Sequence, residues 1–385
     1  MKRIALYASL VGYCIGIFLV CDIVFSSLFY RKGEGKARIA HPVFHHALAP
    51  NVDSYSVWGE VPYRIKTNSL GFKDAAVRDV PLKTNMRRIL LIGDSFTEAV
   101  GIPFENSFAG LLYEAGQARE EKIEFLNAGL GSYSPVLYYK KIKHYIDTGL
   151  QVDEVVVFPD ISDIYDEATA YFCVDDDPSY RRNCSTISEI TPGLRDILNE
   201  RFVLTNRLRL LAKLHIRSFL SARKKKEALL DLASRGERGV RAGWTLPEFA
   251  AGDAYAPLGV EGGIQRALKN MRSLADLLKE RNIALSVVVY PWPILVDREM
   301  RESRHVALWR EYCEGRCKAF IDLSPPFIAM KKAHEDWYER LFIAGDNHFS
   351  AEGNKLVFSE LAKHLLGSDK SPPKDVSGRA DGASP

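Results

Sequence analysis

The sequence lacks the short motifs that most directly reveal an enzyme's chemistry. It contains neither G-x-x-x-x-G-K-[ST] nor G-x-G-x-x-G, so no phosphate-binding loop or dinucleotide-binding turn is visible. It also lacks G-x-S-x-G, the turn that carries the nucleophile of α/β hydrolases. The formal net charge is only +3 with 26% charged residues, which gives no argument for nucleic-acid binding or for disorder. We therefore expect a globular protein without nucleotide-dependent chemistry.

Cysteines are few, six in 385 residues, and four of them form two local pairs in the body of the chain. Two readings stay open: disulfides formed in an oxidising compartment, or four unlinked buried thiols. The pairs are Cys173 with Cys184 and Cys313 with Cys317.

Nothing in the sequence completes a metal site. No second C-x-x-C or His pair accompanies the cysteines, and His41, His45 and His46 have no carboxylate or thiol at ligand spacing. We expect these histidines to pack or to lie on the surface, and we predict no metal and no organic cofactor.

The first 32 residues predict a single transmembrane anchor. The run from Ile4 to Cys21 has no charge, is longer than a usual signal-peptide core and is followed by no small-residue cleavage site. The bulky Val20 before Cys21 fits a lipoprotein box poorly. Basic residues after the run outnumber those before it, which by itself favours a cytoplasmic body; the cysteine pairs favour an extracytoplasmic one.

The rest of the chain predicts an α/β fold. Five short apolar runs alternate with helical patterns, which is typical of a parallel sheet covered on both faces. A polar leader over 33–84, with an extended strand or β hairpin at 63–74, precedes the main domain at 85–367. Residues 368–385 have the composition of a disordered tail. The five expected strands are 88–92, 123–127, 154–158, 283–290 and 319–323.

The alternation of strands and helices stops between about 165 and 262, and we interpret this segment as a helical insertion. Basic residues alternate with leucines from 194 to about 234. Such a helix either packs on the core through its leucines or lies on anionic lipid or an acidic polymer.

A G-D-S motif follows the first predicted strand of the domain. Ser95 lies at the carboxyl end of that strand, where open α/β sheets hold ligands and where helix amides are free to bind an anion. A serine there is a candidate nucleophile. The alternative is that Asp94 and Ser95 only cap a helix.

Near the other end, Asp346 and His348 lie two residues apart in a polar turn. Serine needs a base to take its proton, and an imidazole needs a carboxylate to fix its tautomer. The two stretches together resemble the SGNH (GDSL) hydrolase family, which implies a flavodoxin-like α/β/α sandwich with a five-stranded parallel sheet. The D-x-H spacing is similar to that of the alginate O-acetyltransferase-like branch.

The resemblance also implies oxyanion donors in three blocks. The family uses the amide of the nucleophile, here Ser95, a glycine of the second block and an asparagine of the third. The glycine aligns with Ser132, one residue after Gly131, and Ser162 stands where the asparagine amide is expected.

We therefore predict a membrane-anchored, single-pass serine esterase or O-acyltransferase with an extracytoplasmic (periplasmic) body. Its substrate would be either an ester-bearing carbohydrate or a lipid. The carbohydrate would be a cell-envelope or exported polysaccharide that carries O-acetyl groups. For the transfer reaction, we expect a membrane partner protein to supply the acyl group. The alternative is a non-catalytic scaffold or glycan-binding component of a polysaccharide modification machine.

Overall fold

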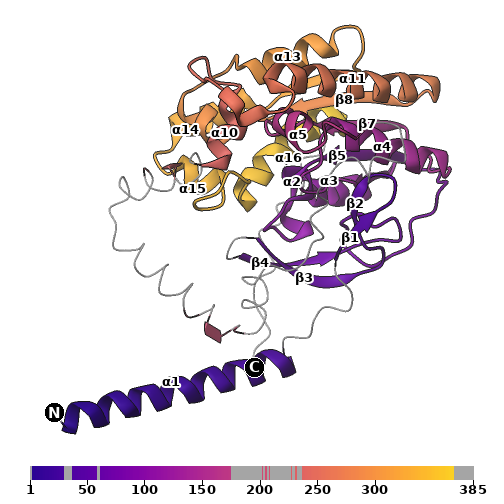
Figure 1. Cartoon of the computed structure of the whole chain (residues 1–385). Helices are drawn as coiled ribbons and strands as arrows, with labels where there is room; N and C mark the ends of the chain where they lie inside the picture. Colours follow the sequence, from indigo (N-terminus) through magenta and orange to yellow (C-terminus); the bar gives the residue numbers. More distant parts are fainter. Residues whose placement is uncertain are drawn as a thin grey trace.

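The computed structural model describes residues 2–29, 37–58, 61–174 and 236–367, together with 202, 204, 205, 208, 227, 230 and 231. Its centre is a five-stranded sheet in which every pairing is parallel, in the order β6-β5-β7-β8-β9 (Figure 1). This confirms the predicted sheet. The strands are β5 (Arg87–Gly93), β6 (Ile123–Asn127), β7 (Glu154–Phe158), β8 (Ala284–Val289) and β9 (Ala319–Asp322).

Strand β5 lies between β6 and β7, so the chain leaves it toward one side of the sheet and later returns to the other. Leu90 of β5 pairs with Leu126 of β6 and with Val155 of β7. Ligands of open α/β sheets bind at the carboxyl ends of the strands where the order reverses in this way. The end of β5 is therefore the expected place for a site.

Two apolar clusters, one on each face of the sheet, make the fold a three-layer sandwich. Leu90 and Ile92 of β5 belong to one cluster, whereas Ile89 and Leu91 belong to the other. The first cluster includes side chains of α4 (Pro135–Asp147), α11 (Gly259–Glu280) and α13 (Arg304–Cys313). The second includes side chains of α3 (Phe108–Gln117), α12 (Pro293–Asp297), α14 (Ser324–Ala333), α15 (Trp337–Leu341) and α16 (Ala351–Leu365).

The leader contributes to the same core. It forms two antiparallel hairpins, β1 (Arg38–His41) with β2 (His45–Leu48) and β3 (Asp53–Trp58) with β4 (Val61–Lys66). The predicted hairpin thus lies earlier than expected, because β4 pairs with residues upstream of it. Leader side chains are buried in the cluster that holds α4 and α11, among them Phe44, Leu48, Ile65 and Phe72.

Outside the sandwich, residues 2–29 form helix α1 (Lys2–Phe29). No helix within the described residues is long and apolar enough to cross a membrane, so the predicted anchor is not confirmed. Most of the predicted basic helix and the tail over 368–385 lie outside the described residues. The described ends of the insertion contain α5 (Asp163–Thr169), α10 (Glu237–Gly243) and the 3-10 turn η2 (Gly252–Tyr255).

One of the two cysteine pairs is resolved. Cys313 and Cys317 form a disulfide at the end of α13. Cys173 is disulfide-bonded as well, while Cys184 lies outside the described residues. For Cys313 and Cys317 the disulfide interpretation is therefore correct.

Candidate active site

Ser95 is presented by a tight turn at the end of β5. Asp94 accepts the amide of Phe96 through Oδ1 at 2.9 Å, which starts the short helix α2 (Ser95–Glu98) with Ser95 as its first residue. A Cβ on the preceding Gly93 would lie 2.1 Å from Oγ1 of Thr97, so only glycine permits this turn. Asp94 thus caps the helix, and the same turn places the buried Ser95 at the carboxyl edge of the sheet.

Asp346 and His348 lie in a fixed loop between α15 and α16. The Ile343 amide donates to the His348 carbonyl at 2.8 Å. The Tyr338 hydroxyl donates to the Asp346 carbonyl at 2.8 Å and accepts the Asp346 amide at 3.0 Å. These bonds hold the loop backbone in one conformation, which orients both side chains.

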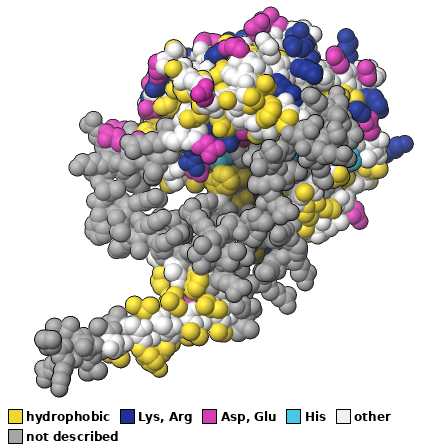
Figure 2. All heavy atoms as spheres, viewed as in Figure 1, with side chains coloured by type: hydrophobic (Ala, Val, Ile, Leu, Met, Phe, Trp, Pro, Cys, Tyr) yellow, Lys and Arg dark blue, Asp and Glu magenta, His cyan; other side chains and the backbone are white. Residues whose placement is uncertain are grey.

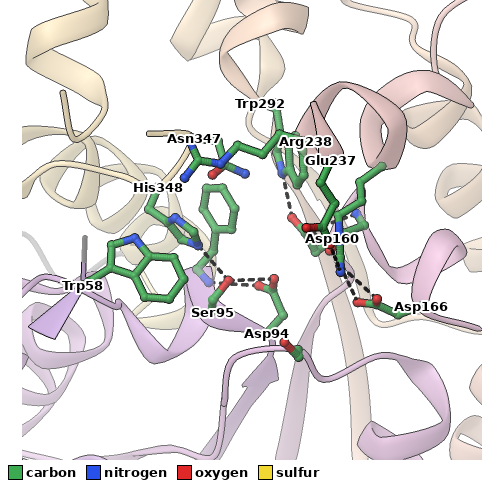
Figure 3. Close-up of a pocket in the computed structure, with 14 residues that line it drawn as sticks. Trp58, Asp94, Ser95, Asp160, Asp166, Glu237, Arg238, Trp292, Asn347 and His348 are labelled. Carbon is green, nitrogen blue, oxygen red and sulfur yellow. Dashed lines mark hydrogen bonds and ion pairs between the residues drawn. The ribbon is translucent and has the colours of Figure 1, made fainter. Parts of the chain in front are cut away.

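The structure brings the three residues of the predicted triad together. His348 Nε2 lies 2.7 Å from Ser95 Oγ, and His348 Nδ1 lies 2.6 Å from Asp346 Oδ1 (Figure 3 shows the first contact). A carboxylate at Nδ1 favours the tautomer in which Nε2 is unprotonated. Nε2 can then accept the hydroxyl proton of Ser95, as a general base does.

Asp346 is held in the charged form. Burial opposes this, but the hydrogen bond and charge of His348, together with the charge of Arg238, lower the pKa of Asp346 overall. Its second oxygen, Oδ2, accepts Nε1 of Trp58 at 3.1 Å and Nη2 of Arg238 at 2.8 Å. Trp58 comes from the leader and Arg238 from the insertion, so both segments reach the site.

Asp94 also contacts the nucleophile, since its Oδ2 lies 3.0 Å from Ser95 Oγ. One hydroxyl hydrogen cannot serve both Asp94 and His348. Burial and the charge of Asp160 raise the pKa of Asp94 well above its usual range. The printed geometry has the Ser95 hydroxyl donating to Asp94 Oδ2. When Asp94 is protonated, the carboxyl can donate to Ser95 Oγ instead, which leaves the serine hydrogen for His348.

Two of the predicted oxyanion donors are already used by the protein. The Gly131 amide donates to Glu98 Oε2 at 2.8 Å, so it is not free in this structure, and the role predicted for it stays a prediction. The Ser162 amide and hydroxyl both donate to Asp160 Oδ1, at 2.8 and 2.6 Å, so neither is free in this structure, and the role predicted for Ser162 also stays a prediction. Each donor has a carboxylate nearby that the sequence did not reveal.

Ser132 remains as the second-block donor. It lines the cavity beside Ser95 and adopts φ of 63°, a left-handed conformation that turns its peptide group away from the preceding one. Among the residues described, no protein acceptor takes its amide hydrogen. Ser132 thus keeps an amide that no described residue uses, whereas the Ser95 amide lies beside the Asp94 carboxyl.

Buried charged side chains hold the loop that carries Gly131 and Ser132. Arg38 Nη2 lies 2.6 and 2.7 Å from the two oxygens of Glu98, and Glu98 in turn binds the Gly131 amide. Burial raises the pKa of Glu98, but the Arg38 charge outweighs it and lowers the pKa overall. His46 Nε2 contacts the Gly131 carbonyl at 2.8 Å.

A cavity of about 230 Å³ opens in front of Ser95. Trp58 and Trp292 give it aromatic walls, and Glu237, Arg238 and Arg241 of α10 give it a charged rim (Figure 3). Trp292 Nε1 donates to Asp160 Oδ2 at 2.8 Å. Such a cavity suits a ligand with apolar faces and many hydroxyl groups.

No group of three or more His, Cys, Asp or Glu side chains in the described part of the chain is placed to hold a metal ion. His46, one of the histidines considered for such a site, is buried, which lowers its pKa to about 3 and keeps it neutral. His46 contacts the Gly131 carbonyl instead.

Comparisons with known proteins give little sequence-level support. No family model matches the chain, and no curated protein matches it. It is similar to solved structures of a variant of Axe2, an acetyl-xylooligosaccharide esterase from Geobacillus stearothermophilus (12% identity, 77% of this chain and 100% of that one, TM-score 0.40), and of the acetyl xylan esterase AlAXEase (13%, 72% and 99%, 0.40). It is also similar to a G-D-S-L family protein from Desulfitobacterium hafniense (14%, 71% and 97%, 0.36). Likenesses this distant carry no argument about activity.

Proposed function

We propose that the chain is a serine esterase or O-acyltransferase that acts on ester groups, in particular O-acetyl groups of a polysaccharide. The observation that carries this proposal is the unbroken chain of contacts from Ser95 Oγ to His348 and on to Asp346, at 2.7 and 2.6 Å. Three groups from distant parts of the sequence meet in the order that nucleophilic catalysis requires.

The proposed reaction begins when His348 Nε2 takes the proton of Ser95 as Oγ attacks the ester carbonyl. The oxygen of the tetrahedral intermediate lies against the amides of Ser95 and Ser132. Collapse of the intermediate breaks the ester bond, and the leaving alcohol takes the proton from His348. The acyl group then sits on Ser95. Attack by water completes hydrolysis, and attack by a sugar hydroxyl completes transfer.

A carbohydrate ester fits the cavity better than a long acyl chain does. Trp58 and Trp292 offer aromatic surface, while the rim carries carboxylates and guanidinium groups that can bind hydroxyls. Among the described residues on the face that Figure 2 shows, both acidic and basic side chains are present. The formal net charge of the chain is only +3, so nucleic acid is not proposed as a partner.

Membrane attachment and an extracytoplasmic body are proposed from the sequence. The uncharged run from Ile4 to Cys21 supports attachment, and the Cys313–Cys317 disulfide supports an oxidising compartment. For the transfer reaction, a membrane protein would supply the acyl group. Fractionation of cells and protease access to the intact chain in spheroplasts test both points.

The activity itself is tested with a fluorophosphonate probe, which labels only an activated serine. We expect the wild type to be labelled and both Ser95→Ala and His348→Ala to be blank, with folding checked by circular dichroism. Chemically acetylated oligosaccharides then serve as substrates, with release of acetate separating hydrolysis from transfer to an added sugar.

A non-catalytic scaffold is the second candidate, and the occupied donors favour it. With Gly131 bound to Glu98 and Ser162 bound to Asp160, the site has fewer oxyanion donors than expected. Absence of labelling in a folded wild type, together with binding of oligosaccharides to the same cavity, is the result that supports this alternative.

A further inference from the structure

The carboxylate of Asp346 is shared between two sets of donors. Its Oδ1 faces His348 Nδ1 at 2.6 Å. Its Oδ2 accepts Arg238 Nη2 at 2.8 Å and Trp58 Nε1 at 3.1 Å. Arg238 also donates through Nη1 to the Gly345 carbonyl at 3.0 Å, so its guanidinium is bound to the loop at two points.

We propose that Arg238 is a positioning residue that holds Asp346 in register with His348, so that its removal changes the pH dependence of the reaction at Ser95. This inference rests on the proposed function, because it concerns the same triad. It assigns a role to α10, a helix of the insertion that the sequence placed outside the catalytic machinery.

Helix α10 is anchored without help from Arg238. Arg241, one turn later, binds both oxygens of Asp166 at 2.9 and 3.1 Å. The Tyr255 hydroxyl donates to the Val240 and Arg241 carbonyls, and Trp244 Nε1 donates to the Ile161 carbonyl at 2.8 Å. A substitution at position 238 therefore leaves the contacts that anchor α10 in place.

From the anchored helix α10, the Arg238 side chain extends to Asp346. Figure 3 shows Arg238 extending over the cavity toward the loop of Asn347 and His348, while Asp166 lies on the opposite side. The Arg238 side chain is 33% exposed and that of Asp346 is 10% exposed. Solvent screens this ion pair only in part, so its charge acts on the carboxylate.

The electrostatic effect has a definite sign. Asp346 and Arg238 act on the His348 ring with opposite signs of charge. Removing the positive charge of Arg238 leaves more negative charge beside the ring, so we expect the acid limb of the labelling profile to move to higher pH. The other ionisable groups around the pair are Asp94 before α2, Asp160 after β7, Asp166 on α5, Glu237 and Arg241 on α10, and Tyr338 on α15.

The test measures the rate of fluorophosphonate labelling of the purified full chain from pH 4.5 to pH 9. We expect Arg238→Gln to move the acid limb of the profile to higher pH by about half a pH unit, a modest shift because the arginine is a third exposed. Arg238→Lys keeps the charge and should restore most of the wild-type limb. Arg310→Gln, which removes an arginine from the surface pair with Glu302, is the matched control.

The possible results are distinguishable. An acid limb that does not move in folded Arg238→Gln overturns the inference, even if the rate at high pH falls, and leaves the proposed function intact. A wild type that is not labelled at any pH overturns the proposed function instead. If Arg238→Gln does not fold, Arg238→Met replaces it, because methionine keeps an aliphatic side chain and removes the charge. A limb shifted in the same direction supports the inference, and an unmoved one overturns it.

Discussion

The backbone amide of Gly131 donates to the buried carboxylate of Glu98 over 2.8 Å. This bond occupies the Gly131 amide, one of the two candidates in the second block for binding an oxyanion. Glu98 is itself held by Arg38, so the Gly131 peptide is fixed with its hydrogen on that carboxylate. The next residue, Ser132, turns its peptide the other way through its left-handed φ of 63°.

Substitutions at Ser132 should therefore act through the backbone alone. Ser132→Pro removes the amide hydrogen and forbids a positive φ, so we expect labelling to slow by about 100-fold or more, the usual effect of losing one oxyanion donor. Ser132→Gly keeps the amide and accepts the left-handed conformation, and it should label within about threefold of wild type. Equal rates for the two variants would show that the Ser132 amide is not a donor.

Ser162 should prove dispensable for stabilising the oxyanion. Its hydroxyl is bound to Asp160 at 2.6 Å and has no second hydrogen to give to a substrate. We expect Ser162→Ala to reduce the labelling rate by less than about fivefold, well short of the effect of a lost oxyanion donor. A loss as large as that of Ser132→Pro would restore Ser162 to the role that the sequence suggested for it.

Asp94 predicts a limb of the pH profile in which labelling falls as the pH rises. Its pKa is raised by burial, and below that pKa the protonated carboxyl can donate to Ser95 Oγ; above it, the carboxylate competes with His348 for the serine hydrogen. Labelling of the wild type should therefore fall as the pH rises past the point at which Asp94 ionises. In Asp94→Asn the limb should disappear, because the Phe96 amide and Tyr290 hydroxyl hold the side-chain oxygen and leave its NH₂ facing Ser95. An unchanged limb in that variant would contradict this role.

Much of the sandwich was predictable because local sequence patterns mark its strands and helices. The strand Val155–Phe158 is an unbroken apolar run, and Pro135 begins α4 at the position that proline favours. The leader was not predictable in the same way. Its strands are short and partly polar, and residues such as Phe44 and Phe72 reveal their burial only once α4 and α11 are in place.

The proximity of Ser95, Asp346 and His348 was predictable for a similar reason, whereas the contacts that support these residues were not. Ser95 and His348 each lie in a short recognisable motif. Arg38 and Arg238 act over 60 and 108 residues of sequence, on Glu98 and Asp346, and no local pattern marks either of them. The choice between Gly131 and Ser132 also depends on a dihedral angle and a buried carboxylate, which an alignment to a motif does not contain.

Lys73 links the leader to the nucleophile's helix. Its Nζ is buried and donates to the carbonyls of Glu98, Ala99 and Ile102 at 3.0, 2.9 and 2.7 Å, at the point where α2 ends. Lys73→Met keeps the volume but leaves these carbonyls without their donor. We expect the free energy of unfolding to fall by about 2 to 3 kcal/mol, measured by urea denaturation.

The deficit of Lys73→Met should also depend on pH. Burial lowers the pKa of Lys73 to about 8 in the folded state, below the value of about 10.4 for an unfolded lysine. Between these values the unfolded chain binds more protons, so the stability contributed by Lys73 rises with pH. The deficit of the variant should therefore be larger at pH 9.5 than at pH 7. Lys363→Met, at an exposed lysine paired with Glu360, is the control and should show no such change; a deficit of Lys73→Met that is independent of pH would mean that the buried amine keeps its proton throughout.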